Sequence, residues 1–139
     1  KQFINAFGEE VIVDNTDRAI VQTCEATNAI ITDYTAAPVY MSDHQSGAHE
    51  WLIEFAKAPT DLEAFTILLD KNLQALNSDY EAKRHKNIAL SLPKITSLKS
   101  GCFHEWLKSK GKLGGQHKVP RLSNERKYIE EVLAVNSYL

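Results

Sequence analysis

The alternation of apolar and polar positions predicts two strands near the middle of the chain. Residues 29–41, AIITDYTAAPVYM, are rich in β-branched and aromatic side chains, and Pro38 confines the far end of this run to a sheet edge or a strand terminus. Residues 49–56, HEWLIEFA, alternate strictly. One face of this second run holds Trp51, Ile53 and Phe55, and the other holds Glu50, Leu52 and Glu54. We expect the two strands to pair antiparallel across the polar loop that joins them.

A helical period follows the second strand. After Pro59, the run Thr60-Asp61-Leu62-Glu63 has the composition of a capping box, which marks the start of a helix. Apolar positions then recur at helical spacing, at Leu62, Phe65, Leu69, Leu73 and Leu76. Earlier in the chain, the polar run at 14–17 offers several N-caps for a helix that extends to about Thr27.

The remaining elements are shorter, and their order indicates the fold class. Gly8-Glu9-Glu10 separates two apolar runs, which predicts an extended N-terminal segment with a turn. We predict extended runs at 2–7 and 11–13, a helix or turn at 77–92 that Pro93 ends, a strand at 94–101, a short helix at 102–111 and a last helix capped by Ser123. The order β-α-β-β-α-β followed by two helices predicts one α+β domain over residues 1–139, with a small mixed sheet packed with helices and a ferredoxin-like outline.

Composition places the chain among ordinary globular proteins. Its 139 residues, 43% of them hydrophobic, suffice for one core without disulfides or a metal. No apolar run approaches the roughly 18 residues that span a bilayer, which excludes a membrane-spanning protein. Cys24 and Cys102 lie far apart and outside any CxxC motif, which is typical of reduced core thiols in a cytoplasmic protein. The chain begins at Lys1 rather than at methionine and shows no secretion signal, so we expect a cytoplasmic fragment of a longer protein.

The net charge of −2 conceals an asymmetry along the sequence. Residues 1–82 contain four Lys or Arg and fourteen Asp or Glu, a net charge of −10, whereas residues 83–127 contain twelve and two, a net charge of +10. The basic segment suggests a face that meets an anion or an acidic partner surface. The alternative is that the basic half simply neutralises the acidic half on the folded surface, and charge alone does not separate the two.

The stretch GKLGGQHKVPRL, residues 111–122, is the strongest candidate for a site. It is not a Walker A loop, because Leu113 follows Gly111-Lys112 where that motif requires Ser or Thr. A glycine-rich turn followed by Lys118 and Arg121 nevertheless offers backbone N–H groups and two cations, which suit a single phosphate or an oxyanion. The alternative is a mobile surface loop.

The sequence gives less support to a metal site or to nucleic-acid binding. The five histidines are His44, His49, His85, His104 and His117. They show no HxxxH or HExxH spacing, so metal binding is not indicated, and His117, next to Lys118, is the one candidate site residue among them. Glu9-Glu10 could ligate magnesium, although paired acids in a turn are usually only solvated. Nucleic-acid binding is disfavoured, because the first 82 residues are strongly acidic and would repel a phosphate backbone.

Several blocks of the sequence, taken in order, resemble a known family. They are FINAFGEEV at 3–11, ITDYTAAPVYM at 31–41, GAHEWLIEF at 47–55, LNSDYEAKR at 76–84 and GKLGGQHKVPRLSNERKYIEE at 111–131. Together they resemble the carboxy-terminal domain of the auxin-responsive acyl acid amido synthetases, in particular of the bacterial members. That family is part of the adenylate-forming superfamily, which includes firefly luciferase and the acyl-CoA synthetases.

The resemblance implies a two-step ligase reaction that uses ATP and Mg²⁺. A carboxylic acid would attack ATP to give an acyl-adenylate and pyrophosphate, and an amine, typically of an amino acid, would then displace AMP to form an amide. The resemblance also implies that residues 1–139 form the lid of a two-domain enzyme, with a large amino-terminal domain as partner. The lid alone would be inactive.

The resemblance assigns the superfamily's phosphate-contacting lysine to Lys118, as the catalytic residue. The phosphate- and nucleotide-binding residues that it implies are Gly114, Gly115, His117 and Arg121. Lys112 competes for the catalytic role, because the usual loop of the superfamily places glycine and lysine directly together, as in Gly111-Lys112. The alternative to a lid is a free-standing ferredoxin-like module that binds a small molecule or a protein and has no catalytic activity.

Overall fold

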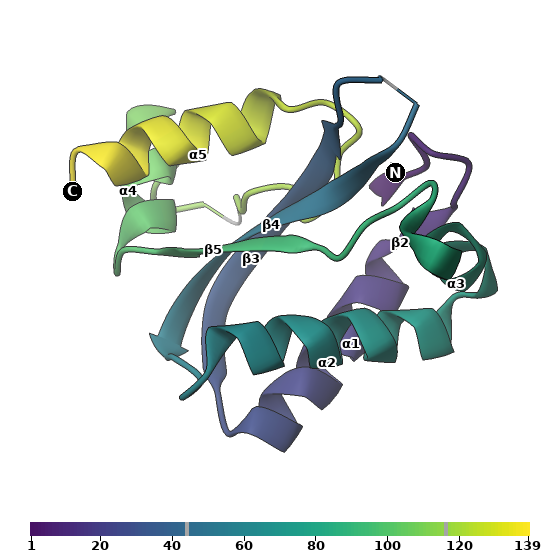
Figure 1. Cartoon of the computed structure of the whole chain (residues 1–139). Coiled ribbons are helices and arrows are strands. Elements are labelled where there is room, and N and C mark those ends of the chain that lie inside the picture. Colours follow the sequence, from purple (N-terminus) through teal and green to yellow (C-terminus); the bar gives the residue numbers. More distant parts are fainter. Residues whose placement is uncertain (44, 116) are drawn as a thin grey trace.

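A three-stranded sheet in the order β3-β4-β5 forms the centre of the protein (Figure 1). The structure is a computed structural model that describes all residues except 44 and 116. β3 (Ile30–Tyr40) pairs antiparallel with β4 (Gly47–Lys57), as predicted. β5 (Lys94–Leu98) lies on the other side of β4 and runs parallel to it. A parallel neighbour requires a crossover connection, and the helical segment between β4 and β5 supplies it.

The N-terminal segment forms a ribbon of its own. β1 (Phe3–Ile4) and β2 (Val11–Ile12) pair antiparallel in a separate two-stranded sheet, and Gly8 turns the chain between them with a φ of +92°. Ile4 and Val11 are fully buried in the core that the first helices share. The predicted extended runs are therefore present, but they lie outside the central sheet, which differs from the strand arrangement of a ferredoxin-like outline.

Two long helices cover one face of the central sheet. α1 (Val13–Thr27) and α2 (Leu62–Leu76) pack against each other, below the sheet in Figure 1. α2 begins one residue later than the capping box predicts, because the Asp61 carboxylate, rather than Thr60, accepts a hydrogen bond from the Ala64 amide. The core between these helices and the strands includes Tyr34, Trp51, Ile53, Phe65, Leu69 and Leu73.

A buried polar cluster holds the next helix to α2. α3 (Ser78–Arg84) and a short 3₁₀ turn (His85–Asn87) form the predicted helical region before β5. The Arg84 guanidinium donates to both oxygens of Asp70 at 2.8 Å, and the Tyr80 hydroxyl donates to the same carboxylate at 2.6 Å. Burial and the Asp70 charge raise the pKa of Tyr80. These contacts fix the crossover that delivers β5 to the sheet.

The opposite face of the sheet is also covered, so the molecule has three layers. α4 (Cys102–Ser109) and α5 (Lys127–Ser137) lie on this face, above the sheet in Figure 1. A second core cluster lies between them and the sheet and consists of Ala37, Leu52, Leu98, Cys102, Phe103, Trp106, Val119, Ile129, Val132 and Val135. Both faces of β4 are therefore buried.

The two glutamates on the second face of β4 are paired inside the fold. Glu54 accepts hydrogen bonds from the Gly101 and Phe103 amides, each at 3.0 Å, at the start of α4. Glu50 pairs with the Arg126 guanidinium at 2.8 Å. A buried carboxylate is tolerated only with such partners, and here both carboxylates also tie the sheet to the helices that cover it.

The last helix begins later than predicted. α5 starts at Lys127, with Arg126 at the N-cap position. Ser123, the predicted cap, lies beside β3 instead, where its amide donates to the Ala36 carbonyl oxygen at 3.2 Å. The residues before α5 are thus used as an extended neighbour of the sheet, which delays the start of the helix.

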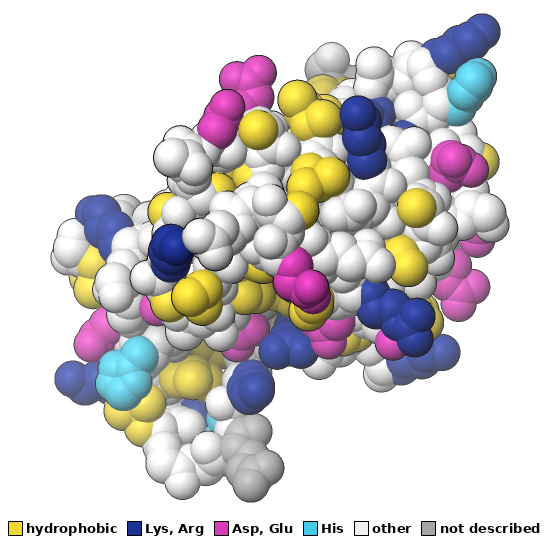
Figure 2. Space-filling view, turned by 90° about the horizontal axis from the view of Figure 1, so that it is seen from below, with side chains coloured by type: hydrophobic (Ala, Val, Ile, Leu, Met, Phe, Trp, Pro, Cys, Tyr) yellow, Lys and Arg dark blue, Asp and Glu magenta, His cyan; other side chains and the backbone are white. Residues whose placement is uncertain are grey.

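The acidic and basic halves of the sequence interleave in the folded molecule. The arginines of the basic segment pair with carboxylates of the acidic one: Arg84 with Asp70, Arg121 with Asp17 and Asp33, and Arg126 with Glu50. Figure 2 shows basic and acidic side chains mixed over one face of the molecule. For these arginines, mutual neutralisation is therefore the better explanation of the asymmetry.

The architecture confirms the α+β class, with small sheets packed against helices and two helices at the C-terminal end. Over the described residues, none of the helices is both long and apolar enough to cross a bilayer. The glycine-rich stretch lies between α4 and α5, outside the helices and strands of this three-layer core.

Candidate functional site

The first glycine of the candidate stretch ends helix α4. Gly111 has a φ of +69°, and its amide donates to the Lys108 carbonyl at 3.0 Å, while the Lys112 amide donates to the Leu107 carbonyl at 3.0 Å. These two bonds form a Schellman motif, which requires glycine at this position. Gly111 and Lys112 therefore directly follow the C-cap residue Lys110 and end the helix, and Lys112 is not among the residues that line the cleft described below.

The next two glycines shape the exposed turn before Lys118. Gly114 has a φ of +83°, which a side chain would strain, and its surroundings are open. A Cβ atom on Gly115 would lie 2.7 Å from the Cδ2 atom of His117, so the imidazole can fold back over the backbone only because residue 115 is glycine. Both glycines and His117 are exposed.

The segment after Lys118 is fixed against β3. Val119 is buried in the second core cluster. The Thr35 hydroxyl donates to the Pro120 carbonyl at 2.7 Å, and the Ala36 amide donates to the Arg121 carbonyl at 2.8 Å. Lys118 is thus an exposed residue directly before an anchored strand-like segment, which places its backbone more firmly than the glycine-rich turn would suggest.

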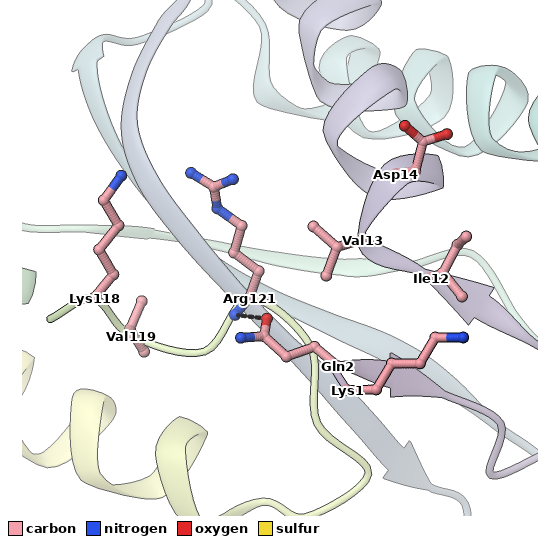
Figure 3. A pocket seen from close by; sticks show the side chains of 8 residues that line it. All are labelled: Lys1, Gln2, Ile12, Val13, Asp14, Lys118, Val119 and Arg121. Carbon is pink, nitrogen blue, oxygen red and sulfur yellow. Dashed lines mark hydrogen bonds between the residues drawn. The ribbon is translucent and has the colours of Figure 1, made fainter. Parts of the chain in front are cut away.

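A cleft of about 610 Å³ opens beside this segment. Its lining comes from the N-terminal ribbon, the start of α1 and the anchored segment: Lys1, Gln2, Ile12, Val13, Asp14, Lys118, Val119 and Arg121. Figure 3 shows the Lys118 and Arg121 side chains extending in the same direction from that segment. Within the described part of the chain, the Lys118 ammonium has no ion pair or hydrogen bond. It is therefore available to an anion that enters the cleft.

Arg121 differs from Lys118 because the domain already neutralises it. Its guanidinium lies 3.0 Å from Asp17 and 3.5 Å from Asp33, and 5.5 Å from the centre of the Tyr34 ring. Burial lowers the pKa of Arg121, but the two carboxylates together outweigh burial and raise it. The arrangement anchors the segment to α1 and β3, and phosphate binding by Arg121 stays a prediction.

Tyr34 completes this anchor from inside the core. Its hydroxyl donates to Asp17 at 2.6 Å and lies 2.8 Å from the Thr16 hydroxyl oxygen. Burial, followed by the hydrogen bond to Asp17, raises the pKa of Tyr34 well above its ordinary value. Tyr34 therefore stays a neutral hydrogen-bond donor at neutral pH and holds the carboxylate that faces Arg121.

The remaining candidates from the sequence lie elsewhere or have structural partners. Glu9 is fully buried rather than solvated, and its two oxygens contact the Phe7 amide at 2.8 Å and His49 at 2.5 Å. Among the described residues, no group of three or more His, Cys, Asp or Glu side chains is placed to hold a metal ion. His44 lies outside the described residues.

Sequence reasoning missed the residues that hold the site together. Gln2, Asp17, Asp33 and Thr35 all contact the segment 120–122. No local pattern marks them, because each lies 85 or more positions away from its partner in the sequence. The signal that pointed to the region was the composition of the glycine-rich stretch alone.

Solved structures share this fold. The chain superposes on a structure described as "GH3.15 acyl acid amido synthetase" with a TM-score of 0.74 at 17% identity, covering 96% of this chain and 25% of that chain. It superposes on "AtGH3.15 acyl acid amido synthetase in complex with 2,4-DB" with a TM-score of 0.73, at the same identity and coverage. The chain therefore spans about a quarter of the length of these proteins.

The family follows from the sequence match. None of the curated proteins matches the chain. The GH3 family C-terminal domain, however, matches residues 14–127, which include β3, β4, the glycine-rich stretch and all of the anchoring segment after Lys118. The chain therefore belongs to the GH3 family and contains its C-terminal domain.

Proposed function

We propose that residues 1–139 form the lid domain of an ATP-dependent acyl acid amido synthetase. The observation that carries the proposal is the position of Lys118, an unpaired ammonium among the described residues, on an anchored segment at a cleft. Membership of the GH3 family supports it. Because the chain spans about a quarter of the two solved relatives, the rest of the enzyme would supply the nucleotide and acyl pockets.

In this proposal the enzyme performs two chemical steps. A carboxylate oxygen of the acid attacks the α-phosphorus of ATP, a new C–O–P linkage forms, and pyrophosphate leaves. An amine then attacks the acyl carbon, AMP leaves with the electrons of the broken C–O bond, and the nitrogen loses a proton as the amide forms. We place the Mg²⁺ with the triphosphate, outside this domain.

Lys118 acts in the first step. Negative charge concentrates on the α-phosphate oxygens as the carboxylate attacks, and a fixed ammonium stabilises that charge most strongly where water is excluded. Closure of the lid over the nucleotide would both bring Lys118 to the phosphate and expel the water. The exposed Gly114-Gly115 turn would let the backbone approach the nucleotide closely, with His117 beside it.

The test compares the two lysines of the glycine-rich stretch in the full-length enzyme. We expect Lys118→Ala to reduce carboxylate-dependent ATP–pyrophosphate exchange by about 10²–10³-fold, the usual effect of removing one preorganised contact to a developing charge. Lys112→Ala is the matched control, because the Lys112 backbone closes the C-terminal end of α4 and its side chain does not line the cleft, and it should leave the exchange rate nearly unchanged.

Thermal unfolding of both variants checks that the fold is intact. Exchange by the Lys118→Ala enzyme at the unsubstituted rate would refute the role of Lys118. A loss in Lys112→Ala with none in Lys118→Ala would assign the phosphate contact to the other lysine.

A further inference from the structure

Two segments from opposite ends of the chain lie side by side at the cleft. The Arg121 amide donates to the side-chain carbonyl oxygen of Gln2 at 2.8 Å, the contact drawn in Figure 3, and the Leu122 amide approaches the same oxygen at 3.4 Å. Three residues further on, Asn5 and Asn124 bond each other reciprocally, through the Asn5 amide at 3.0 Å and the Asn124 side-chain amide at 2.8 Å. The N-terminal ribbon is thus joined directly to the segment that follows Lys118.

The bonds from Gln2 complete the anchoring of that segment. Its carbonyl groups are held by β3, because Thr35 donates to Pro120 and the Ala36 amide donates to Arg121. Its amides at 121 and 122 are held instead by Gln2. The segment is therefore fixed from two directions, and the bonds to its amides at 121 and 122 come from one side chain, Gln2, which is exposed and lines the cleft.

Among the described residues, the glycine-rich turn before Lys118 shows no comparable contact, so the anchoring lies on the C-terminal side of the lysine. The turn at 114 and 115 is exposed and glycine-rich. The lysine side chain is long and flexible, so its ammonium can be aimed only if the backbone beneath it is held. A displacement of about 1 Å at a reacting centre is enough to cost about 10²-fold in rate.

We propose that Gln2 is a positioning residue for Lys118. Its carbonyl oxygen locks the Arg121 and Leu122 amides against the N-terminal ribbon, and this contact holds the Lys118 backbone at the cleft. The inference rests on the proposed function of Lys118, but its structural part, the locking of the two amides, is measured separately from activity.

The structural part is tested on the 139-residue chain by NMR hydrogen exchange. We expect Gln2→Ala to speed exchange of the Arg121 amide about tenfold, which is the usual effect of losing one hydrogen bond. Gln2→Glu keeps an acceptor oxygen at the same place and should restore protection. Gln45→Ala removes an exposed glutamine in the turn between β3 and β4 and should leave the Arg121 amide unchanged. Unchanged exchange in Gln2→Ala would overturn the proposal.

The functional part is tested by a double-substitution cycle in the full-length enzyme. Gln2→Ala should lower the maximal rate of ATP–pyrophosphate exchange about tenfold, with rescue by Gln2→Glu, and should have no further effect when Lys118→Ala is already present. The positioning role would be overturned if Gln2→Ala were fully active while Lys118→Ala was impaired. It would also be overturned if the rate losses of the two single variants multiplied in the double variant. Either result would leave the proposed function of Lys118 unaffected. A fully active Lys118→Ala enzyme would instead refute the proposed function of Lys118 and, with it, the positioning role, whatever the amide exchange shows.

Discussion

Lys118 and Arg121 carry the same charge and lie three positions apart, but their electrostatic surroundings differ. The Arg121 guanidinium faces Asp17 and Asp33 and holds the segment to the core. The Lys118 ammonium meets no carboxylate in the described structure and stands at the cleft. Two cations in a glycine-rich stretch therefore do not make two equivalent phosphate ligands, because one of them is already neutralised within the domain.

Tyr34, which holds the Asp17 carboxylate that faces Arg121, makes the stability of the fold depend on pH in the alkaline range. Its folded-state pKa is raised above the ordinary value of about 10. The stabilisation is therefore fully present below about pH 10 and is lost as the pH rises above it, at about 1.4 kcal/mol per pH unit for one such group. We expect the free energy of unfolding, measured with urea between pH 8 and 11, to fall less steeply above pH 10 in Tyr34→Phe than in the unsubstituted chain.

An exposed tyrosine provides the comparison. Tyr138 is 69% exposed, so Tyr138→Phe should keep the steep alkaline slope of the unsubstituted chain. Tyr80, whose pKa is also raised, contributes equally to all three proteins. Equal slopes above pH 10 in Tyr34→Phe and the unsubstituted chain would contradict this account of the anchor.

At the residue scale, composition indicated the candidate segment, whereas the residues that anchor it lie far away in the sequence. Lys118 was singled out because glycines and cations cluster around it in the sequence, and the structure places it at the cleft, while its catalytic role stays a prediction. Gln2 could not be singled out, because the amide that it holds lies 119 positions away and an exposed glutamine carries no local signal. For Glu9 the sequence predicted a solvated side chain, because a pair of acids in a turn usually faces water. The structure instead places Glu9 in the core, where it contacts His49.

At the element scale, Glu54 on β4 fixes the beginning of helix α4, which packs on that face of the sheet. Both of its carboxylate oxygens accept backbone amides at the beginning of α4. Glu54→Gln replaces one acceptor by an amide group that faces another donor, so we expect it to lower the free energy of unfolding by about 1–3 kcal/mol. Urea unfolding at pH 7 measures the change.

A glutamate outside such a contact is the control for that substitution. Glu25 is exposed on α1, and Glu25→Gln should change stability by less than about 0.5 kcal/mol. If both substitutions changed the free energy of unfolding by the same small amount, the hydrogen bonds of Glu54 would not stabilise the start of α4.

Elements with a long regular period were predictable, and short ones were not. β3 follows from its β-branched and aromatic composition, β4 from the alternation over 49–56, and α2 from its helical spacing. The two-residue strands β1 and β2 carry no period, so their pairing with each other could not be read from the sequence. The start of α5 was predicted three residues early, because Ser123 resembles a cap but lies against β3.

At the scale of the whole molecule, the covered sheet explains why the candidate site lies at the edge. Helices pack on both faces of β4, so the described cleft forms where the N-terminal ribbon, α1 and the segment after Lys118 meet beside β3. The class of the fold followed from the order of the elements. The third layer, formed by α4 and α5, could not be predicted. Two glutamates on that face of β4, Glu50 and Glu54, indicate an exposed face, and their buried partners are not visible in the strand pattern.

We propose that this domain serves an adenylating enzyme rather than acting alone. The most direct test of this proposal is carboxylate-dependent ATP–pyrophosphate exchange, measured for the native gene product beside the 139-residue domain with a panel of aromatic and aliphatic carboxylic acids. We expect exchange by the native product with at least one acid and none by the isolated domain. Exchange by the isolated domain, or no exchange by the native product with any of the acids, would show that the domain is not the lid of an adenylating enzyme.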